Sequence, residues 1–476
     1  MKNLLLLIAL AVSTMPISAT VSLDSCRNMA VRNNKTIRVA EENIRGAEYL
    51  KKAAQSAYLP GIDFTGTYMY NQRIINLLGE DAKLPTMSFN ASTQSYDYNI
   101  VKGPDGIPVK DPSTGSYIPT EVAVIPKEAM SYDIHNVFAG AITLTQPVFM
   151  GGQIKALNEI AGYGKELAKA MRNNLTQDVI YSVDEAYWMV VSLKEKKTLA
   201  QSFVNLVDSL RYNVQEMLNE GVATRSDLLT VEVKLNEANI ALTKVDNGLS
   251  LSRMALAQIC GLPVHTQMEL EDEQLRTASS VIPDNQYNMQ DVYARRQDLE
   301  MLRQGINMLK GKEKLAMGDM LPKIGIIGAY SFSNPNVIDG FEKKFGGGFS
   351  VGAAVTIPIW HWGGNLNKYK AAKSNTSAQR MLLEDMEEKV DLQVSQAQFR
   401  FDEARKTFDM TVANLKKADE NLRQAQLGFK EGVLTSDDVI AAQTAWLAAN
   451  SEKIDAEIGI RLCQTYLSKV LGNLAY

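Results

Sequence analysis

The chain has 476 residues, of which 45% are hydrophobic and 22% charged, and its formal net charge is −4. This length is enough for two or three ordinary domains, and the composition is that of a globular protein. The charge balance, without any basic run, excludes a nucleic-acid-binding protein, which needs a positive surface to follow phosphates.

Residues 1–19 have the organisation of a secretory signal peptide. Lys2 supplies the positive charge, Leu4 to Val12 form the apolar stretch, and Ser18 with Ala19 are small residues suited to cleavage. Ile17 leaves the cleavage position open. An N-terminal membrane anchor is the alternative, although the apolar run is shorter than the roughly 20 residues that span a bilayer. No later apolar stretch is long enough for a membrane helix, so we expect an exported protein that is either soluble or crosses a membrane with β-strands.

Three phrases occur twice in the chain and in the same order. The pairs are YLPGIDFTGTYMY (58–70) with MLPKIGIIGAYSF (320–332), TQPVFMGGQ (145–153) with TIPIWHWGGN (356–365), and EGVATRSDLL (220–229) with EGVLTSDDVI (431–440). The last pair is separated by 211 positions (431 − 220). A repeat of this size indicates a duplication and a pseudo-symmetric architecture.

Residue periodicity places the elements along the two repeats. The first repeat covers 20–261, with strands over about 61–71 and 137–149, long helices over about 152–219 and 226–260, and an extracellular loop over about 72–136. A linker, expected to be equatorial, covers 262–287. The second repeat covers 288–476, with strands over about 323–333 and 348–360 and helices over about 364–431 and 437–471.

The predicted long helices carry apolar residues at steps of three and four. At 1.5 Å per residue, the helices predicted over about 152–219 and 364–431 would each be roughly 100 Å long. A solvated antiparallel coiled coil explains this pattern as well. The predicted strands alternate over about ten residues, which is typical of transmembrane β-strands but also of a half-buried strand in a soluble sandwich. Four membrane strands per chain cannot close a barrel, so the membrane interpretation requires an oligomer.

The repeated Glu-Gly-Val phrase, at 220–229 and 431–440, lies where two long predicted helices meet. Gly221 and Gly432 occupy positions that favour a left-handed C-terminal cap. Thr224 with Asp227, and Thr435 with Asp438, have the spacing of a capping box. Each phrase therefore predicts a tight turn of a helical hairpin.

Together these motifs identify a resemblance to the TolC-like outer membrane factors, also called outer membrane efflux proteins, over essentially the whole mature chain. The resemblance implies a mainly α fold with a small transmembrane β part. It implies a duplicated repeat of two strands plus long helices, in a homotrimer whose 12-stranded β-barrel is continued by a periplasmic α-barrel. The implied location is the outer membrane of a Gram-negative bacterium, in contact with its lipid and with a large periplasmic part.

The implied function is the passive exit duct of a tripartite efflux or type I secretion system, carrying small molecules or drugs. A periplasmic membrane-fusion adaptor would connect the duct to an inner-membrane pump. By resemblance, the adaptor docks on the turns, at the residues Gly221, Val222, Ala223, Thr224, Gly432, Val433, Leu434 and Thr435.

By the same resemblance, Asp227 and Asp438 match aspartates at the pore constriction, a role that is compatible with helix capping. The chain departs from the family pattern at Ala441, where a second aspartate is expected, and at Leu434, where an arginine is expected. The gating residues, the transported substrate, the pump class and the adaptor are therefore not identified.

No catalytic, cofactor-binding or metal-ligating pattern accompanies these motifs, so we expect no enzyme and no cofactor. His135, His265 and His361 are isolated. Cys26, Cys260 and Cys463 are expected to be small buried residues. Lipidation of Cys26 stays open, although Asp24 lies where a small residue is expected. The alternative function is a soluble periplasmic coiled-coil scaffold or adaptor; an exported enzyme is a third possibility without a supporting motif.

Overall fold

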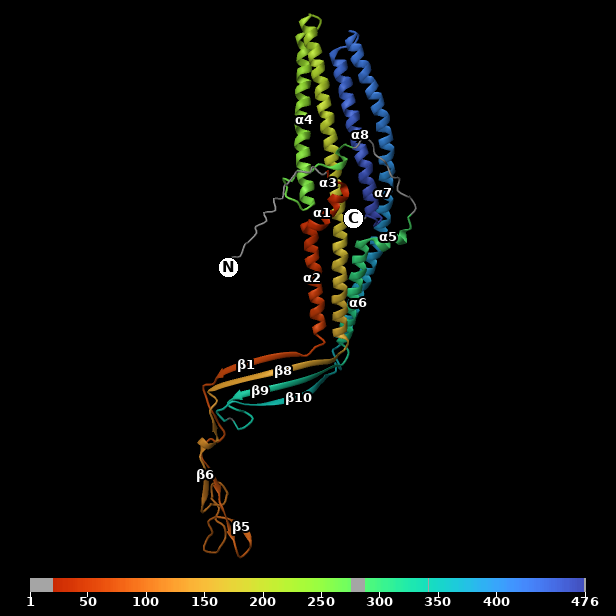
Figure 1. Ribbon diagram of the computed structural model, residues 1–476. Coiled ribbons are helices and arrows are strands. Elements are labelled where there is room, and N and C mark those ends of the chain that lie inside the picture. Colours follow the sequence, from red (N-terminus) through yellow and green to blue (C-terminus); the bar gives the residue numbers. More distant parts are fainter. Residues whose placement is uncertain (1–19, 275–286, 341, 475–476) are drawn as a thin grey trace, which may run out of the picture. The chain divides into compact units, whose positions relative to one another are not determined.

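The computed structural model describes residues 20–274, 287–340 and 342–474 (Figure 1). The predicted signal peptide, residues 1–19, and residues 275–286 of the predicted linker lie outside this description. Of the described residues, 62% are helical, and others form strands. None of the described helices is both long enough and apolar enough to cross a membrane.

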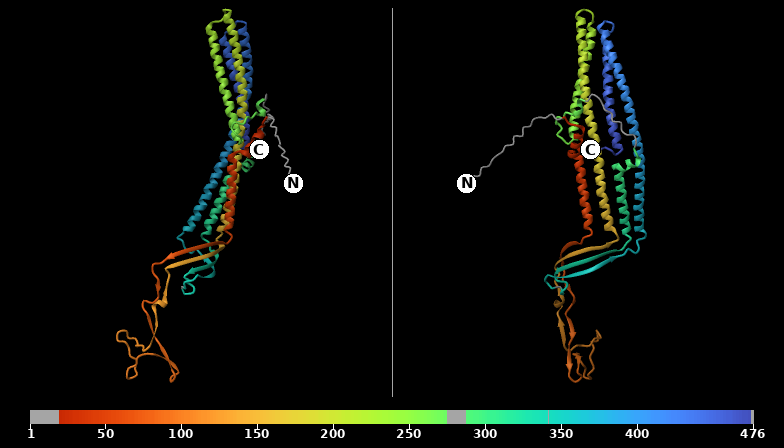
Figure 2. Two further views of the ribbon diagram at one scale, coloured as in Figure 1. Left: turned by 60° about the vertical axis from the view of Figure 1, so that its left-hand side comes forward. Right: turned by 45° about the vertical axis from the view of Figure 1, so that its right-hand side comes forward.

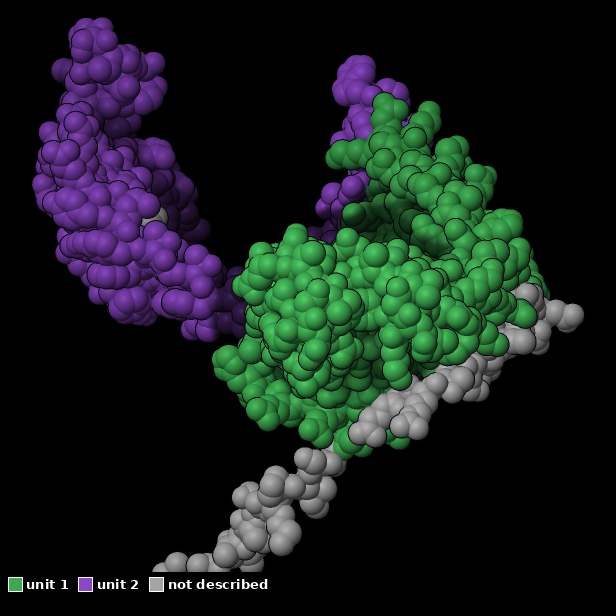
Figure 3. Space-filling model, turned by 90° about the horizontal axis from the view of Figure 1, so that it is seen from above, with its two compact units in different colours: residues 1–54, 155–316, 367–476 green, residues 55–154, 317–366 purple. Residues whose placement is uncertain are grey.

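The chain divides into two compact units, coloured separately in Figure 3. The helical unit comprises Met1–Ala54, Lys155–Ala316 and Asn367–Tyr476, and the sheet unit comprises Gln55–Ile154 and Met317–Leu366. Each unit draws segments from both sequence repeats. The two units therefore do not correspond to the two repeats, because each repeat contributes to both units.

Eight α-helices are present among the described residues. They are α1 (Leu23–Asn33), α2 (Lys35–Ser56), α3 (Gln153–Asn219), α4 (Arg225–Ile259), α5 (Met289–Arg295), α6 (Gln297–Gly318), α7 (Gly364–Lys430) and α8 (Ser436–Val470). A 3₁₀ turn, η2, covers Glu271–Gln274.

The two long hairpins of the helical unit have the same dimensions. Helices α3 and α7 each contain 67 residues, and α4 and α8 each contain 35. Every boundary is displaced by 211 positions between the repeats (364 − 153, 430 − 219, 436 − 225 and 470 − 259). In Figure 1, α3 and α8 lie next to each other between α4 and α7, and the right-hand view of Figure 2 shows the two hairpins separately.

Buried side chains hold the helical unit together in three clusters. One cluster joins α1 to α3 and α4 around Tyr187 and Leu256, both 0% exposed. A second cluster lies among the distal ends of α3, α4, α7 and α8, and includes Val207 and Leu228. The third joins α5, α6, α7 and α8 around Leu299. The apolar stripes of the helices are therefore buried in helix–helix contacts along the unit.

The sheet unit is built on four antiparallel strands. They are β1 (Gly61–Tyr70), β8 (Asn136–Met150), β9 (Lys323–Asn334) and β10 (Gly346–Thr356), in the order β1-β8-β9-β10. All ten positions of β1 are exposed, and β1 and β10 are the two edges of the sheet. The strand expected over 348–360 ends at Thr356, because the following Pro358 has no N–H to donate to a ladder.

The segment 72–136, expected as a loop, contains short strands. They are β2 (Ile75–Asn76), β3 (Ala82–Pro85), β4 (Met87–Asn90), β5 (Ser95–Tyr98), β6 (Val122–Ile125) and β7 (Ser131–Tyr132), with a 3₁₀ turn, η1, at Lys127–Met130. They pair as β2·β7, β3·β6 and β4·β5, so the segment is a series of nested hairpins. Strands of two to four residues are too short to show an alternating pattern against the surrounding Pro, Gly, Ser and Asp.

Candidate functional site

The turn between α3 and α4, called here the first tip, is closed by a Schellman motif. Gly221 has φ +77°, a left-handed conformation that glycine adopts without strain. The N–H of Gly221 donates to the carbonyl of Leu218 at 3.0 Å, and the N–H of Val222 donates to the carbonyl of Met217 at 2.8 Å. These bonds satisfy carbonyls that the end of α3 would leave unpaired.

A capping box begins α4 at the same tip, as the sequence predicts. The N–H of Asp227 donates to Oγ1 of Thr224 at 3.2 Å. In return, the N–H and the hydroxyl of Thr224 both donate to Oδ2 of Asp227, each at 2.8 Å. These bonds lower the pKa of Asp227 because they stabilise its ionised form, and the bond from the backbone N–H of Thr224 has the largest effect.

The turn between α7 and α8, the second tip, repeats this geometry. Gly432 has φ +76°, and the N–H of Val433 donates to the carbonyl of Gly428 at 2.8 Å. Thr435 and Asp438 form the second capping box, with distances of 2.9 Å and 3.3 Å for the two backbone donors. The pKa of Asp438 is lowered for the same reason as that of Asp227.

Each tip presents one valine to solvent. Val222 is 73% exposed and Val433 is 79% exposed. The tips differ in charge, because Arg225 of the first tip corresponds to Ser436, and Ser226 corresponds to Asp437 of the second. Each hairpin therefore ends in an exposed valine, and the two ends differ in charge.

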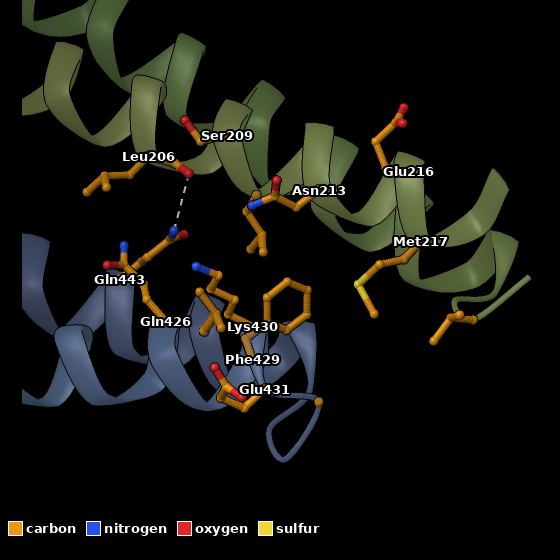
Figure 4. Close-up of a pocket in the computed structure, with 14 residues that line it drawn as sticks. Leu206, Ser209, Asn213, Glu216, Met217, Gln426, Phe429, Lys430, Glu431 and Gln443 are labelled. Carbon is orange, nitrogen blue, oxygen red and sulfur yellow. Dashed lines mark hydrogen bonds between the residues drawn. The ribbon is translucent and has the colours of Figure 1, made fainter. Parts of the chain in front are cut away.

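A groove of about 650 Å³ lies between the tips (Figure 4). Gln443 of α8, 2% exposed, crosses it and donates from Nε2 to the carbonyl of Leu206 on α3 at 3.3 Å. Met217 and Phe429 supply apolar lining from opposite hairpins. No motif in the sequence predicts this groove, because the groove depends on which helices become neighbours.

Helices α3 and α8 remain in contact far from the tips. Their other contacts are Lys196–Asp455 (2.6 Å), Arg461 over the ring of Trp188 (4.5 Å), Tyr181–Tyr466 (ring centroids 5.9 Å apart) and Lys469–Asp178 (2.8 Å). With Gln443 and Leu206, these pairs define the α3–α8 interface, which joins the two repeats within one chain.

The predicted site residues thus gather at two places and not at one. The structure places the eight docking candidates at the two tips and bonds Asp227 and Asp438 to their capping threonines. Among the described residues, no group of three or more His, Cys, Asp and Glu could hold a metal ion. Trp360 and Trp362, which flank His361, are 70% and 87% exposed after the end of β10.

Comparisons with known proteins find similarity in sequence and in fold. Residues 288–473 match the family described as outer membrane efflux protein. The outer membrane efflux protein BepC of Brucella suis biovar 1 (strain 1330) is 22% identical over 439 residues, which cover 88% of this chain and 90% of BepC.

Two solved structures share the fold of the chain. CusC, studied for the conformational changes that accompany folding and transmembrane channel formation, has a TM-score of 0.71 and 14% identity, covering 94% of this chain and 91% of its own. The outer-membrane channel OprN has a TM-score of 0.71 and 15% identity, covering 95% and 90%. The chain therefore shares the fold of these two structures.

Proposed function

Because residues 288–473 match the outer membrane efflux protein family, we propose that the chain belongs to this family and is the outer membrane channel of a tripartite efflux or type I secretion system. In this role it is a passive duct that carries small molecules across the periplasm and the outer membrane of a Gram-negative bacterium. The observation that carries the proposal is the pair of unpaired edges, β1 and β10, on a sheet of four strands.

The sheet edges support closure by further copies of the chain. Backbone groups in a bilayer must all be paired, so a membrane sheet has to close on itself. The internal repeat relates β8 to β10 by 211 positions and β1 to β9 by 262 (323 − 61). The β8–β9 pairing inside the chain therefore corresponds to a pairing of β10 with β1 of the next copy. Three copies of four strands give a barrel of twelve.

This correspondence specifies a register. Thr143 faces Ala329 in the β8–β9 pair. Adding 211 to the first number and subtracting 262 from the second places Ala354 of one copy opposite Thr67 of the next. A head-to-tail contact of this kind closes into a ring of three copies when each copy is rotated by about 120° from the one before it.

The helices support the same arrangement. The repeat equivalents of α3 and α8 are α7 and α4, so the α3–α8 interface corresponds to a contact of α7 with α4 of another copy. Trp188 of α3 is 5% exposed under Arg461, whereas its equivalent on α7, Phe399, is 74% exposed. Lys417 and Glu232, the equivalents of Leu206 and Gln443, carry opposite charges suited to such a contact.

We assign the tips to partner docking. A membrane-fusion adaptor would bind the residues Gly221 to Thr224 and Gly432 to Thr435, and would connect the duct to an inner-membrane pump. The exposed Val222 and Val433 supply the apolar contact, and two similar tips per chain give six in a homotrimer. Asp227 and Asp438 are proposed to line the constriction while they cap their helices.

Cysteine cross-linking tests the proposal. In a Cys463→Ser background, Ala354→Cys with Thr67→Cys should form a disulfide between copies, seen as a covalent trimer on a denaturing gel. Ala354→Cys with Ile62→Cys is the control, because five residues along a strand displace the thiol by about 17 Å. Cross-linking of the control pair instead, or of neither pair, would contradict the register.

Fractionation and light scattering separate the channel from a soluble periplasmic coiled-coil scaffold. The channel should remain with the outer membrane and require detergent for extraction. Light scattering of the purified protein, corrected for bound detergent, should give three copies. A single chain that stays monodisperse in detergent-free buffer would exclude the channel.

A further inference from the structure

The structure brings two cysteines together that are far apart in the sequence. Cys26 lies in α1 and Cys260 caps the end of α4, and both are 0% exposed in one hydrophobic cluster. The Sγ of Cys260 donates to the carbonyl oxygen of Cys26 at 3.6 Å, across a separation of 234 positions. The third cysteine, Cys463, belongs to α8 and is only partly buried.

The backbone around the pair is held closely. The side-chain amide of Asn34, just after α1, donates to the carbonyl of Ile259 at 2.9 Å. Gly261 has φ +73°, and a Cβ added there would lie 2.6 Å from the carbonyl oxygen of Asn33. The end of α1 and the end of α4 therefore touch on both sides of Cys260, about two helical turns along α1 from Cys26.

We propose that Cys26 and Cys260 form a structural disulfide in the exported protein, which fastens α1 to the end of α4. The proposal rests on the export that the proposed function implies, since disulfides persist in oxidising compartments such as the periplasm. Both thiols lose a proton and one electron, and an S–S bond forms. A thiol–disulfide oxidoreductase of that compartment accepts the two electrons, and its own disulfide is reduced to two thiols.

The bond forms while the chain folds. In the folded protein the interaction with the side chain of Cys260, together with burial, raises the pKa of Cys26. Thiolates are the reactive species, so the thiol of Cys26 is unreactive once packing is complete. Oxidation therefore precedes closure of the cluster, and the finished disulfide is shielded from reductants.

The same geometry opposes lipidation of Cys26. A lipidated cysteine would be the first residue of the mature chain, which would remove Ser22, whose hydroxyl caps α1 by accepting from the N–H of Ser25 at 3.3 Å. It would also attach a diacylglyceryl group, through a thioether, to a sulfur in a closed cluster. Lipidation and the disulfide compete for the same sulfur atom, so a single measurement decides between them.

The test counts free thiols in the full-length protein purified from outer membranes. The protein is denatured in detergent and treated with a polyethylene-glycol maleimide, with and without prior reduction. We expect one adduct per chain before reduction, on Cys463, and three after it, one for each cysteine. Three adducts before reduction, or an intact mass increased by acyl chains, would overturn the proposal.

Cysteine variants show whether the adduct count reflects a disulfide or only a change in folding. Cys26→Ser and Cys260→Ser should each gain one adduct before reduction, and Cys463→Ser should lose its only one. Reductant should lower the thermal midpoint of the wild type by several degrees but leave Cys26→Ala/Cys260→Ala unchanged. An equal effect of reductant on both would contradict the disulfide. Trimers in the outer membrane with three free thiols would refute it and leave the proposed channel intact.

Discussion

Leu434 lies directly over Gly428: a Cβ added to Gly428 would stand 2.7 Å from Cδ1 of Leu434. In the first repeat the equivalent residues are Met217 and Ala223, so the large and the small partner are exchanged. Both tips keep the same Schellman bonds. The duplicated turn thus retains its backbone while the two halves have changed in a complementary way.

This exchange predicts an effect of Gly428→Ala. An alanine in a helix is favoured over glycine by about 1 kcal/mol, but here its methyl group must displace Leu434. We expect no gain, or a loss, in the thermal midpoint of unfolding. Gly46→Ala is the matched control, because nothing lies within 4 Å of that Cβ, and it should raise the midpoint. The double variant Gly428→Ala/Leu434→Ala should recover the gain; if it does not, the contact is unimportant.

Asp438 allows capping and pore charge to be separated. Asp438→Asn removes the charge, but its amide oxygen can still accept from Thr435, whereas Asp438→Ala removes both functions. If the aspartates form the constriction, both variants should change ion conductance in planar bilayers, and we expect an increase. A change with alanine alone would assign Asp438 to capping only.

The capping boxes make the tips sensitive to acid. The pKa of Asp438 is lowered in the folded chain, first by the hydrogen bond from the N–H of Thr435. Its stabilising contribution is therefore complete above the pKa of an unfolded aspartate, about 3.9, and is lost as the pH falls through the lower folded value. Amide protection factors at Thr435 should fall below pH 4. In Asp438→Asn they should not depend on pH in this range; the same acid loss there would contradict the mechanism.

The exposed valines of the tips predict a loss of efflux. Val222→Glu and Val433→Glu place a charge on the proposed docking surface, and Gly432→Pro is incompatible with φ +76°. We expect drug susceptibility to rise to that of a deletion strain, with trimer assembly unchanged. Val264→Glu, at a residue 44% exposed and away from the tips, should have no effect. Unaltered susceptibility of the tip variants would contradict docking.

The ion pair between α1 and α3 should be important for stability. Asp184 is 0% exposed and accepts two bonds from Arg27, at 2.7 Å and 2.5 Å. Arg27→Ala leaves a buried carboxylate without its partner, which costs roughly 3–5 kcal/mol. Arg45→Ala, which breaks an exposed pair with Glu42, should leave the thermal midpoint unchanged. Similar midpoints for the two variants would show that Asp184 finds another partner.

The sequence alone was sufficient for features that depend on local chemistry. The 3.6-residue period predicts the long helices, and the repeated Glu-Gly-Val phrase predicts both tips, since the left-handed cap needs glycine and the box needs Thr and Asp three apart. The resemblance to the efflux proteins rests on the same local motifs. Short-range rules failed in the segment 72–136, where strands of a few residues leave no pattern.

Contacts between distant segments were decided only by the tertiary structure. Arg27 and Asp184 are 157 positions apart, Cys26 and Cys260 are 234 apart, and Gln443 and Leu206 are 237 apart. An apolar stripe shows that a helix has a buried face, but many helices could cover that face equally well. The choice of neighbour depends on how whole helices fit together, and that free energy is spread over the full length of each interface.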